Sequence, residues 1–87
     1  MSNNTVTALQ VVEILNNSEV KALHLNGKTT IVTVTLPNGF VIVESSSCVD
    51  PANYDPVLGE KICLDRVRDK IWELEGYVLQ SKVAGLL

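Results

Sequence analysis

The chain is poor in the side chains that most often serve as catalysts or metal ligands. Its 87 residues include one histidine and two cysteines. His24, Cys48 and Cys63 are too few for an ordinary metal site, which takes three or four protein ligands. The sequence contains no CxxC pair, no nucleophile elbow around a serine and no glycine-rich phosphate loop. We therefore expect no enzyme, no catalytic residue, no metal site and no cofactor.

Positive charge is also scarce. Seven lysines and arginines stand against ten aspartates and glutamates, and the net charge is −3. The basic residues between positions 61 and 70 alternate with acidic ones, a pattern typical of a solvated, ion-paired helix face. Proteins that bind nucleic acid normally carry a basic patch and a high pI. A nucleic-acid partner is therefore not expected.

Long apolar runs are absent. The longest covers residues 40–43, whereas a membrane-spanning helix needs about 20 apolar residues. The first residues lack a basic region followed by an apolar run, so we expect no signal peptide. These features favour a soluble cytoplasmic protein with no membrane contact, in which both cysteines stay reduced.

The hydrophobic content, in contrast, is high at 46%. It indicates a single folded domain over residues 1–87, with residues 1–6 as a disordered tail. A domain this small buries only about 60% of the surface that its unfolded chain exposes. Self-association would supply further burial.

The N-terminal part predicts a short helix. Thr7 and Gln10 have the spacing of a capping box, which satisfies two free amide groups at a helix start. Leu9 and Val12 then suggest the apolar side of a helix over residues 8–17, to which Ile14 and Leu15 could add.

Two turn signals predict a three-stranded antiparallel meander. Asn26-Gly27 suits a two-residue turn, because both residues tolerate positive φ. Pro37-Asn38-Gly39 suits a type I turn followed by a left-handed glycine. Paired residue numbers then sum to 53 in the first hairpin and to 76 in the second.

That register places the apolar residues of the three strands on one face of the sheet. The predicted face contains Leu23, Leu25, Val32, Val34, Leu36, Phe40 and Ile42. His24 is placed on the opposite, less apolar face, as an ordinary side chain near a strand end. A slip of one residue would exchange the faces of a strand.

The C-terminal part predicts a long helix. Asp50-Pro51 and Asp55-Pro56 both have the pattern of an N-cap followed by proline, the first for a single turn and the second for the main helix. That helix extends to about residue 82, roughly 40 Å. Its predicted core stripe is Cys63, Val67, Ile71, Leu74 and Val78. The fold class is therefore α+β: a short N-terminal helix, a three-stranded antiparallel β-meander and a long C-terminal helix on one sheet face.

A helix of that length overhangs its sheet, because a nine-residue strand spans only about 30 Å. The overhang is apolar, and a second copy of the chain would cover it most simply. Trp72 can pack in the core or anchor an interface beside Gly76, and both can hold in a dimer. The candidate residues for self-association are Trp72, Gly76, Tyr77, Leu79 and Val83.

The loop before the long helix is the candidate contact surface for a partner or ligand. It contains Asp50, Asn53, Tyr54 and Asp55, and Tyr54 could serve as an aromatic anchor. The alternative is a rigid connector in which Tyr54 packs over the sheet. The two aspartates would repel a phosphate from the helix starts that they cap.

Several segments resemble one protein family. They are LPNGF at residues 36–40, ESSSCVDPANYD at residues 44–55, Gly59, and KIWELEGY at residues 70–77. Over residues 28–83 the chain is similar to the small tailed-bacteriophage proteins named after gene products of phages N4 and Sf6. The resemblance implies a phage-encoded accessory protein in the host cytoplasm. It implies no activity, cofactor or catalytic residue.

Together these observations favour a non-enzymatic phage accessory protein, a homo-oligomer that binds a host protein. The alternative is an oligomer that sequesters a small molecule such as a nucleotide signal, in a pocket built at the subunit interface.

Overall fold

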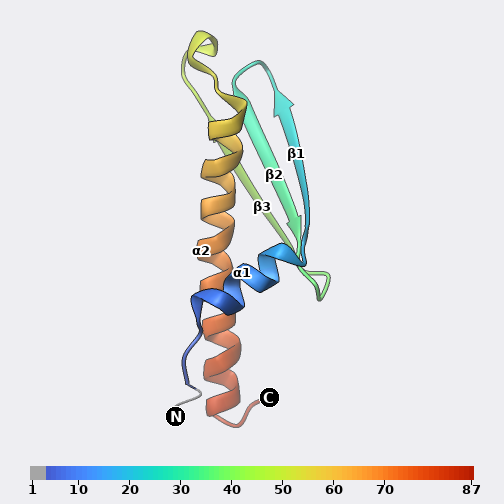
Figure 1. Cartoon of the computed structure of the whole chain (residues 1–87), viewed down its shortest axis with the longest axis vertical. Coiled ribbons are helices and arrows are strands. Elements are labelled where there is room, and N and C mark those ends of the chain that lie inside the picture. Colours follow the sequence, from blue (N-terminus) through green and yellow to red (C-terminus); the bar gives the residue numbers. More distant parts are fainter. Residues whose placement is uncertain (1–3) are drawn as a thin grey trace.

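The structure is a computed structural model that describes residues 4–87. In chain order it contains α1 (Ala8–Asn16), β1 (Glu19–Leu25), β2 (Thr29–Thr35), β3 (Val41–Ser47), the 3-10 helix η1 (Pro51–Asn53) and α2 (Pro56–Val83). The strands form an antiparallel sheet in the order β1-β2-β3. Helix α2 runs along β2 and β3, and α1 lies across α2 (Figure 1). The predicted α+β fold is confirmed.

Local sequence signals account for the helix starts. The Thr7 hydroxyl accepts a hydrogen bond from the Gln10 amide at 3.2 Å, and the Gln10 side chain accepts one from the Thr7 amide at 2.8 Å. Asp55 caps α2 by accepting from the amides of Val57 and Leu58. Of the tail predicted over residues 1–6, residues 1–3 lie outside the described part, and Val6 packs against the core.

The buried side of α1 differs from the prediction. Val11 is buried, with Ile14 and Leu15 packed beside it, while Leu9 is 66% exposed and Val12 is also exposed. Helix α1 contacts the rest of the chain mainly through α2, so only the narrow stripe around Val11 is covered. The predicted side was wrong at Leu9 and Val12 for that reason, whereas Ile14 and Leu15 pack against the core as suggested.

The second hairpin has the predicted turn and register. The amide of Gly39 donates to the carbonyl of Leu36 at 2.8 Å, and Gly39 has a φ of 91°. The Leu36 amide in turn donates to the Phe40 carbonyl. Val34 faces Ile42, as expected from a sum of 76.

The first hairpin has the predicted turn but a different register. Asn26 and Gly27 both have positive φ, and the Lys28 amide donates to the Leu25 carbonyl at 3.2 Å. The ladder nevertheless pairs Leu25 with Thr29, so that paired numbers sum to 54. Lys28 is therefore a third residue between the two paired strands, whereas the predicted sum of 53 paired it with Leu25.

The cause lies on the other side of β2. The carbonyl of Lys28 accepts from the Cys48 amide at 2.9 Å, so its backbone already serves the pairing with β3. The shift by one residue turns β1 over. Leu23 and Leu25, predicted to face the core, lie on the sheet face away from α2, and His24 faces the helix.

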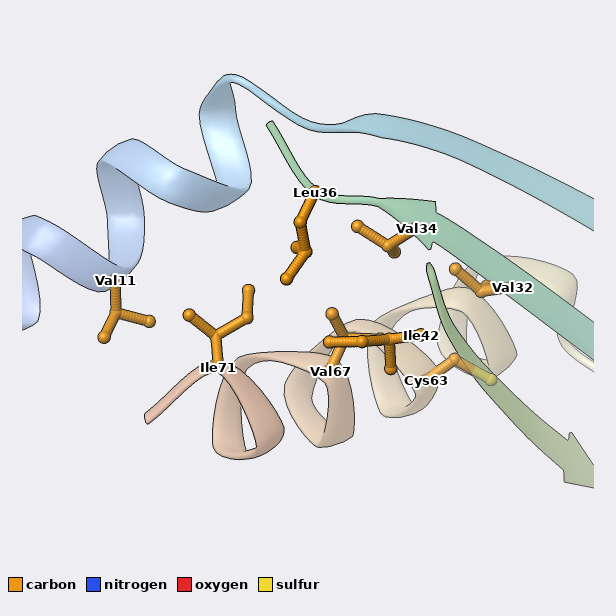
Figure 2. Close-up of a cluster of buried hydrophobic side chains, with 8 residues drawn as sticks. All are labelled: Val11, Val32, Val34, Leu36, Ile42, Cys63, Val67 and Ile71. Carbon is orange, nitrogen blue, oxygen red and sulfur yellow. The ribbon is translucent and has the colours of Figure 1, made fainter. Parts of the chain in front are cut away.

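The core lies between the sheet and α2 (Figure 2). It contains Val11, Val32, Val34, Leu36, Ile42, Cys63, Val67 and Ile71. The predicted stripe of α2 is confirmed at its buried members, and Leu74 and Val78 are half-buried. Burial raises the pKa of the Cys63 thiol above its usual value. Both cysteines are free thiols.

Two surfaces remain uncovered by this packing. Helix α2 has 28 residues and spans about 42 Å, whereas each seven-residue strand spans about 24 Å, so the helix extends beyond the sheet (Figure 1). In addition, both helices leave one face of the sheet open. We call this open side the outer face. Its apolar members are Leu23, Leu25, Ile31, Val41 and Val43.

Candidate functional site

A polar cluster closes the end of the sheet where α2 begins. The Tyr54 hydroxyl lies 2.7 Å from His24 Nδ1, 2.7 Å from Thr30 Oγ1 and 3.2 Å from the Thr29 carbonyl. His24 Nε2 lies 3.2 Å from Glu60 Oε2. The cluster thus joins β1, β2, the loop before α2 and the first turns of α2.

The Tyr54 hydroxyl carries one proton, which it can donate either to the Thr29 carbonyl or to Nδ1 of His24. The Thr30 hydroxyl can donate to the Tyr54 oxygen, and an Nε2–H of His24 can donate to Glu60. A carboxylate, imidazole and hydroxyl in this order can activate a nucleophile in some enzymes. Here the tyrosine oxygen is held by three groups of its own chain, so the arrangement is that of a latch that fixes the loop.

In the predicted contact loop, most of the side chains either cap a helix or belong to this polar cluster. Asp50 accepts from the Ala52 amide at 2.9 Å and caps η1, and Asp55 caps α2. Tyr54 is half-buried, whereas Asn53 is exposed. A cavity of about 130 Å³ lies beside the loop, with room for only a few water molecules.

A larger hollow lies at the opposite end of the sheet, between the start of β3 and the C-terminal half of α2. We call it the β3–α2 groove. Its volume is about 470 Å³, and its lining residues are Phe40, Val41, Ile42, Val43, Lys70, Glu73, Leu74 and Tyr77. Phe40 is 52% exposed and Tyr77 is 75% exposed, so both rings lie open to solvent. The groove has a size typical of binding sites.

The charges at the groove do not form an anion site. Lys70 is ion-paired with Glu44 of β3, and Glu73 adds negative charge beside it. In the part of the chain that the structure describes, no group of three or more histidine, cysteine or acidic side chains could hold a metal ion. The lining thus favours an apolar occupant over a phosphate or a metal.

The edge of β3 beside the groove carries free backbone groups. In an antiparallel pair, opposite residues alternate between pairs that exchange hydrogen bonds and pairs that do not. The bond from the Leu36 amide to the Phe40 carbonyl places Phe40, and with it Ile42, in the bonded set. Val41 and Val43 therefore direct their N–H and C=O groups away from β2, where no strand within residues 4–87 meets them.

The second half of β3 is partly obstructed by side chains of α2. Arg66 Nη1 donates to the Ser45 carbonyl at 2.6 Å, across the same edge. Glu44 is held by Lys70. The accessible part of the edge is therefore limited to residues 40–43.

The predicted self-association residues do not share one face of α2. At about 100° per residue, Tyr77 lies about 140° around the helix from Trp72. Tyr77 lines the groove. The other four, Trp72, Gly76, Leu79 and Val83, follow one another at steps of four, three and four residues along a different side. Trp72 is 37% exposed, and the core cluster does not include it.

Sequence reasoning did not find the polar cluster. Tyr54 and Glu60 lie 30 or more residues from His24 in the chain, and the predicted register placed His24 on the wrong face. A sum of 54 in the first hairpin would have placed His24 opposite Thr30 on the helix side. The β3–α2 groove, in contrast, had a partial signal in the uncharged run at residues 40–43.

Comparison with known proteins identifies a family for this sequence. The model of the phage protein family described as N4 Gp49/phage Sf6 gene 66 matches residues 3–83. No curated protein and no solved structure matches the chain. None of the described helices is long and apolar enough to cross a membrane. The match spans nearly the whole sequence, so the chain belongs to the N4 Gp49/phage Sf6 gene 66 family of phage proteins.

Proposed function

We propose that this family member is a non-enzymatic accessory protein that self-associates and, as an assembly, binds a host protein in the host cytoplasm. The observation that carries the proposal is the exposed area. The chain has an accessible surface of 6056 Å², whereas a compact monomer of 9.5 kDa exposes about 5,050 Å². The excess, roughly 1,000 Å², is similar to the 800 Å² or so that each partner buries in a standard interface.

The excess comes from an extended shape. The radius of gyration is 15.7 Å, whereas a compact domain of 87 residues has about 12 Å. The added surface is rich in apolar groups at the groove, on the outer face and along the overhang of α2. Large exposed apolar patches on small proteins mark sites of protein contact.

The polar cluster supports the non-enzymatic part of the proposal. A catalytic group must reach a substrate, whereas the polar atoms of Tyr54 and His24 are hydrogen-bonded within the chain. The hydrogen bonds of Tyr54 and His24 thus hold the loop before α2 in place.

The alternative of a nucleotide-sequestering oligomer has less support. Lys70 is the one basic residue among the described residues that line the β3–α2 groove, and it is already paired with Glu44. A nucleotide needs positive charge or free amide groups for its phosphates. We therefore place protein contact first.

The self-association half is tested by the absolute mass of the purified native protein, from light scattering and native mass spectrometry. We expect a dimer of about 19 kDa, twice the 9.5 kDa of the chain. A mass of 9.5 kDa at all concentrations up to those of the cell would contradict it.

The host-binding half is tested with two matched variants of the tagged protein. Leu23→Ser removes an exposed side chain from the outer face, and Val57→Ser removes one from the first turn of α2. We expect a host protein to be captured by the wild type and by Val57→Ser, and to be lost with Leu23→Ser. Capture by none of the three above an untagged control would refute this half, and equal capture by all three would show that the host protein does not bind the outer face.

A further inference from the structure

We propose that the second copy binds at the free edge of β3, so that two sheets join into one antiparallel six-stranded sheet. This inference rests on the proposed self-association and names the surface that makes it. The residues that pair are Val41 and Val43, whose outward backbone groups lie beside the β3–α2 groove.

The two edges of the sheet differ in their protection against strand pairing. Exposed edges are normally blocked by charges, bulges or covering elements. Along β1, Glu19 and Lys21 place charges near the edge, and His24 is held by Glu60. The first half of β3 carries no such device over residues 40–43, and its side chains there are all apolar. That stretch is therefore the one suited to receive a strand.

The neighbouring bonds fix where the two-fold axis must pass. The Gly39 amide is used in the turn, and the Ser45 carbonyl is used by Arg66. In the first half of β3, Val41 and Val43 are the described residues with both backbone groups free at this edge. Only an axis at Ile42 pairs these two residues with each other, Val41 of each copy opposite Val43 of the other. Each of the two pairs exchanges two N–H···O bonds.

The same axis fits the helices. Helix α2 packs over β2 and β3 alike, so its axis lies about one strand spacing, roughly 4.8 Å, from the proposed two-fold axis. The two copies of α2 would then lie about 10 Å apart, close to the usual distance between packed helices. The groove side of α2, with Leu74 and Tyr77, would be covered by the partner.

Side-chain chemistry agrees with this pairing. On the outer face, Val41 of one copy would stand opposite Val43 of the other, an apolar β-branched pair of the kind that stabilises sheets. On the helix side, Ile42 of one copy would stand opposite Ile42 of the other, and Phe40 of each copy would stand opposite Glu44, beside the Lys70 ion pair at the edge of the groove. The surfaces buried in this way are among those that are most exposed in the single chain.

The test is a proline placed at the edge, with a threonine at the same position as its control. Val43→Pro removes the outward N–H, while the bonds between β2 and β3 do not use that group, so the fold is expected to persist. Val43→Thr keeps the N–H and the branched shape but lowers the apolar character. We expect the proline variant to fall to the monomer mass and the threonine variant to remain a dimer.

The outcomes separate this inference from the proposed function. A dimeric Val43→Pro would overturn the β3 edge and leave self-association standing. Loss of the dimer in both variants would assign it to the outer face and also overturn the edge. A monomeric wild type would overturn the self-association itself, and with it this inference.

A second measurement does not depend on the folding of any variant. Hydrogen exchange of the wild type is followed at a concentration where it is dimeric and after dilution to the monomer. We expect the amides of Val41 and Val43 to exchange at least about tenfold more slowly in the dimer. Unchanged exchange would overturn the pairing, and protection that appears only when a host protein is added would show that the edge takes a foreign strand.

Discussion

The two ends of the sheet are built in opposite ways. At the end where α2 begins, hydroxyl, imidazole and carboxylate groups of His24, Thr30, Tyr54 and Glu60 meet and satisfy one another. At the other end, Phe40 and Tyr77 lie open beside a strand edge. One end is complete within the chain, and the other offers apolar surface and free backbone groups.

The difference follows from how closely α2 approaches the sheet. Gly59 is buried against Thr30, and any side chain there would collide with the Thr30 hydroxyl. This contact brings the start of the helix down onto β2. Further along, the helix extends past the end of the sheet, and Gly76 has no heavy atom within 4 Å of where a Cβ would stand. The fold is thus tight where the helix starts and open where the helix ends.

The largest effect on stability is expected in the hydrophobic core, between the two ends of the sheet. Ile71 is buried and packs with Val11 and the sheet residues (Figure 2). Ile71→Ala should lower the free energy of unfolding by about 2–5 kcal/mol, since it removes buried methyl groups and leaves a cavity. Urea denaturation at low protein concentration measures this. Leu9→Ala, at an exposed site, is the control and should change stability by less than about 0.5 kcal/mol.

Two glycine substitutions in the same helix should act in opposite directions. Gly59→Val places a branched side chain against Thr30 and should destabilise by about 1–3 kcal/mol through overpacking. Gly76→Ala meets open space and should stabilise by up to about 1 kcal/mol through helix propensity. Thermal unfolding of both variants measures the two changes in stability. Equal effects would show that the two ends of α2 are packed alike.

The polar latch should contribute less than the core. Tyr54→Phe removes the hydroxyl that joins His24, Thr30 and the Thr29 carbonyl, and should cost about 1 kcal/mol. The readout is the urea midpoint, together with faster hydrogen exchange of the loop at residues 50–55. Tyr77→Phe is the matched control. A loop that exchanges as in the wild type would show that Tyr54 is held by ring packing alone.

The smallest effect on the single chain is expected in the groove. Tyr77→Ala should change monomer stability by less than about 0.5 kcal/mol, because the side chain is largely exposed. The same variant should weaken the dimer if the groove is covered by a second copy. Urea denaturation at low protein concentration measures the monomer stability, and sedimentation at several concentrations measures the association. A large loss of monomer stability would mean that the open end is part of the core.

The sequence predicted most features that depend on neighbouring residues. The capping box at Thr7, the turn at Gly39 and the cap at Asp55 each use groups within a few positions, and all were confirmed. The buried stripe of α2 was confirmed because a long helix repeats its pattern often enough to average out exceptions.

The wrong predictions concerned features that depend on contacts between residues far apart in the sequence. The first hairpin depends on whether Lys28 is counted in the ladder, and the carbonyl of Lys28 is directed by Cys48, 20 positions away. The buried side of α1 depends on where one other helix crosses it. The site at Tyr54 requires the register of the first hairpin and the approach of the start of α2 to the sheet. The four residues proposed for that loop were therefore placed without their partners.

The bond from Arg66 to the Ser45 carbonyl has a consequence for colloidal behaviour. Fibrils grow from long, flat strand edges that can add one molecule after another. With Arg66 across half of β3 and charges along β1, the chain offers only a short apolar stretch, which a single partner would use up. Growth would then stop at a closed pair, and the protein could accumulate in a cell without polymerising.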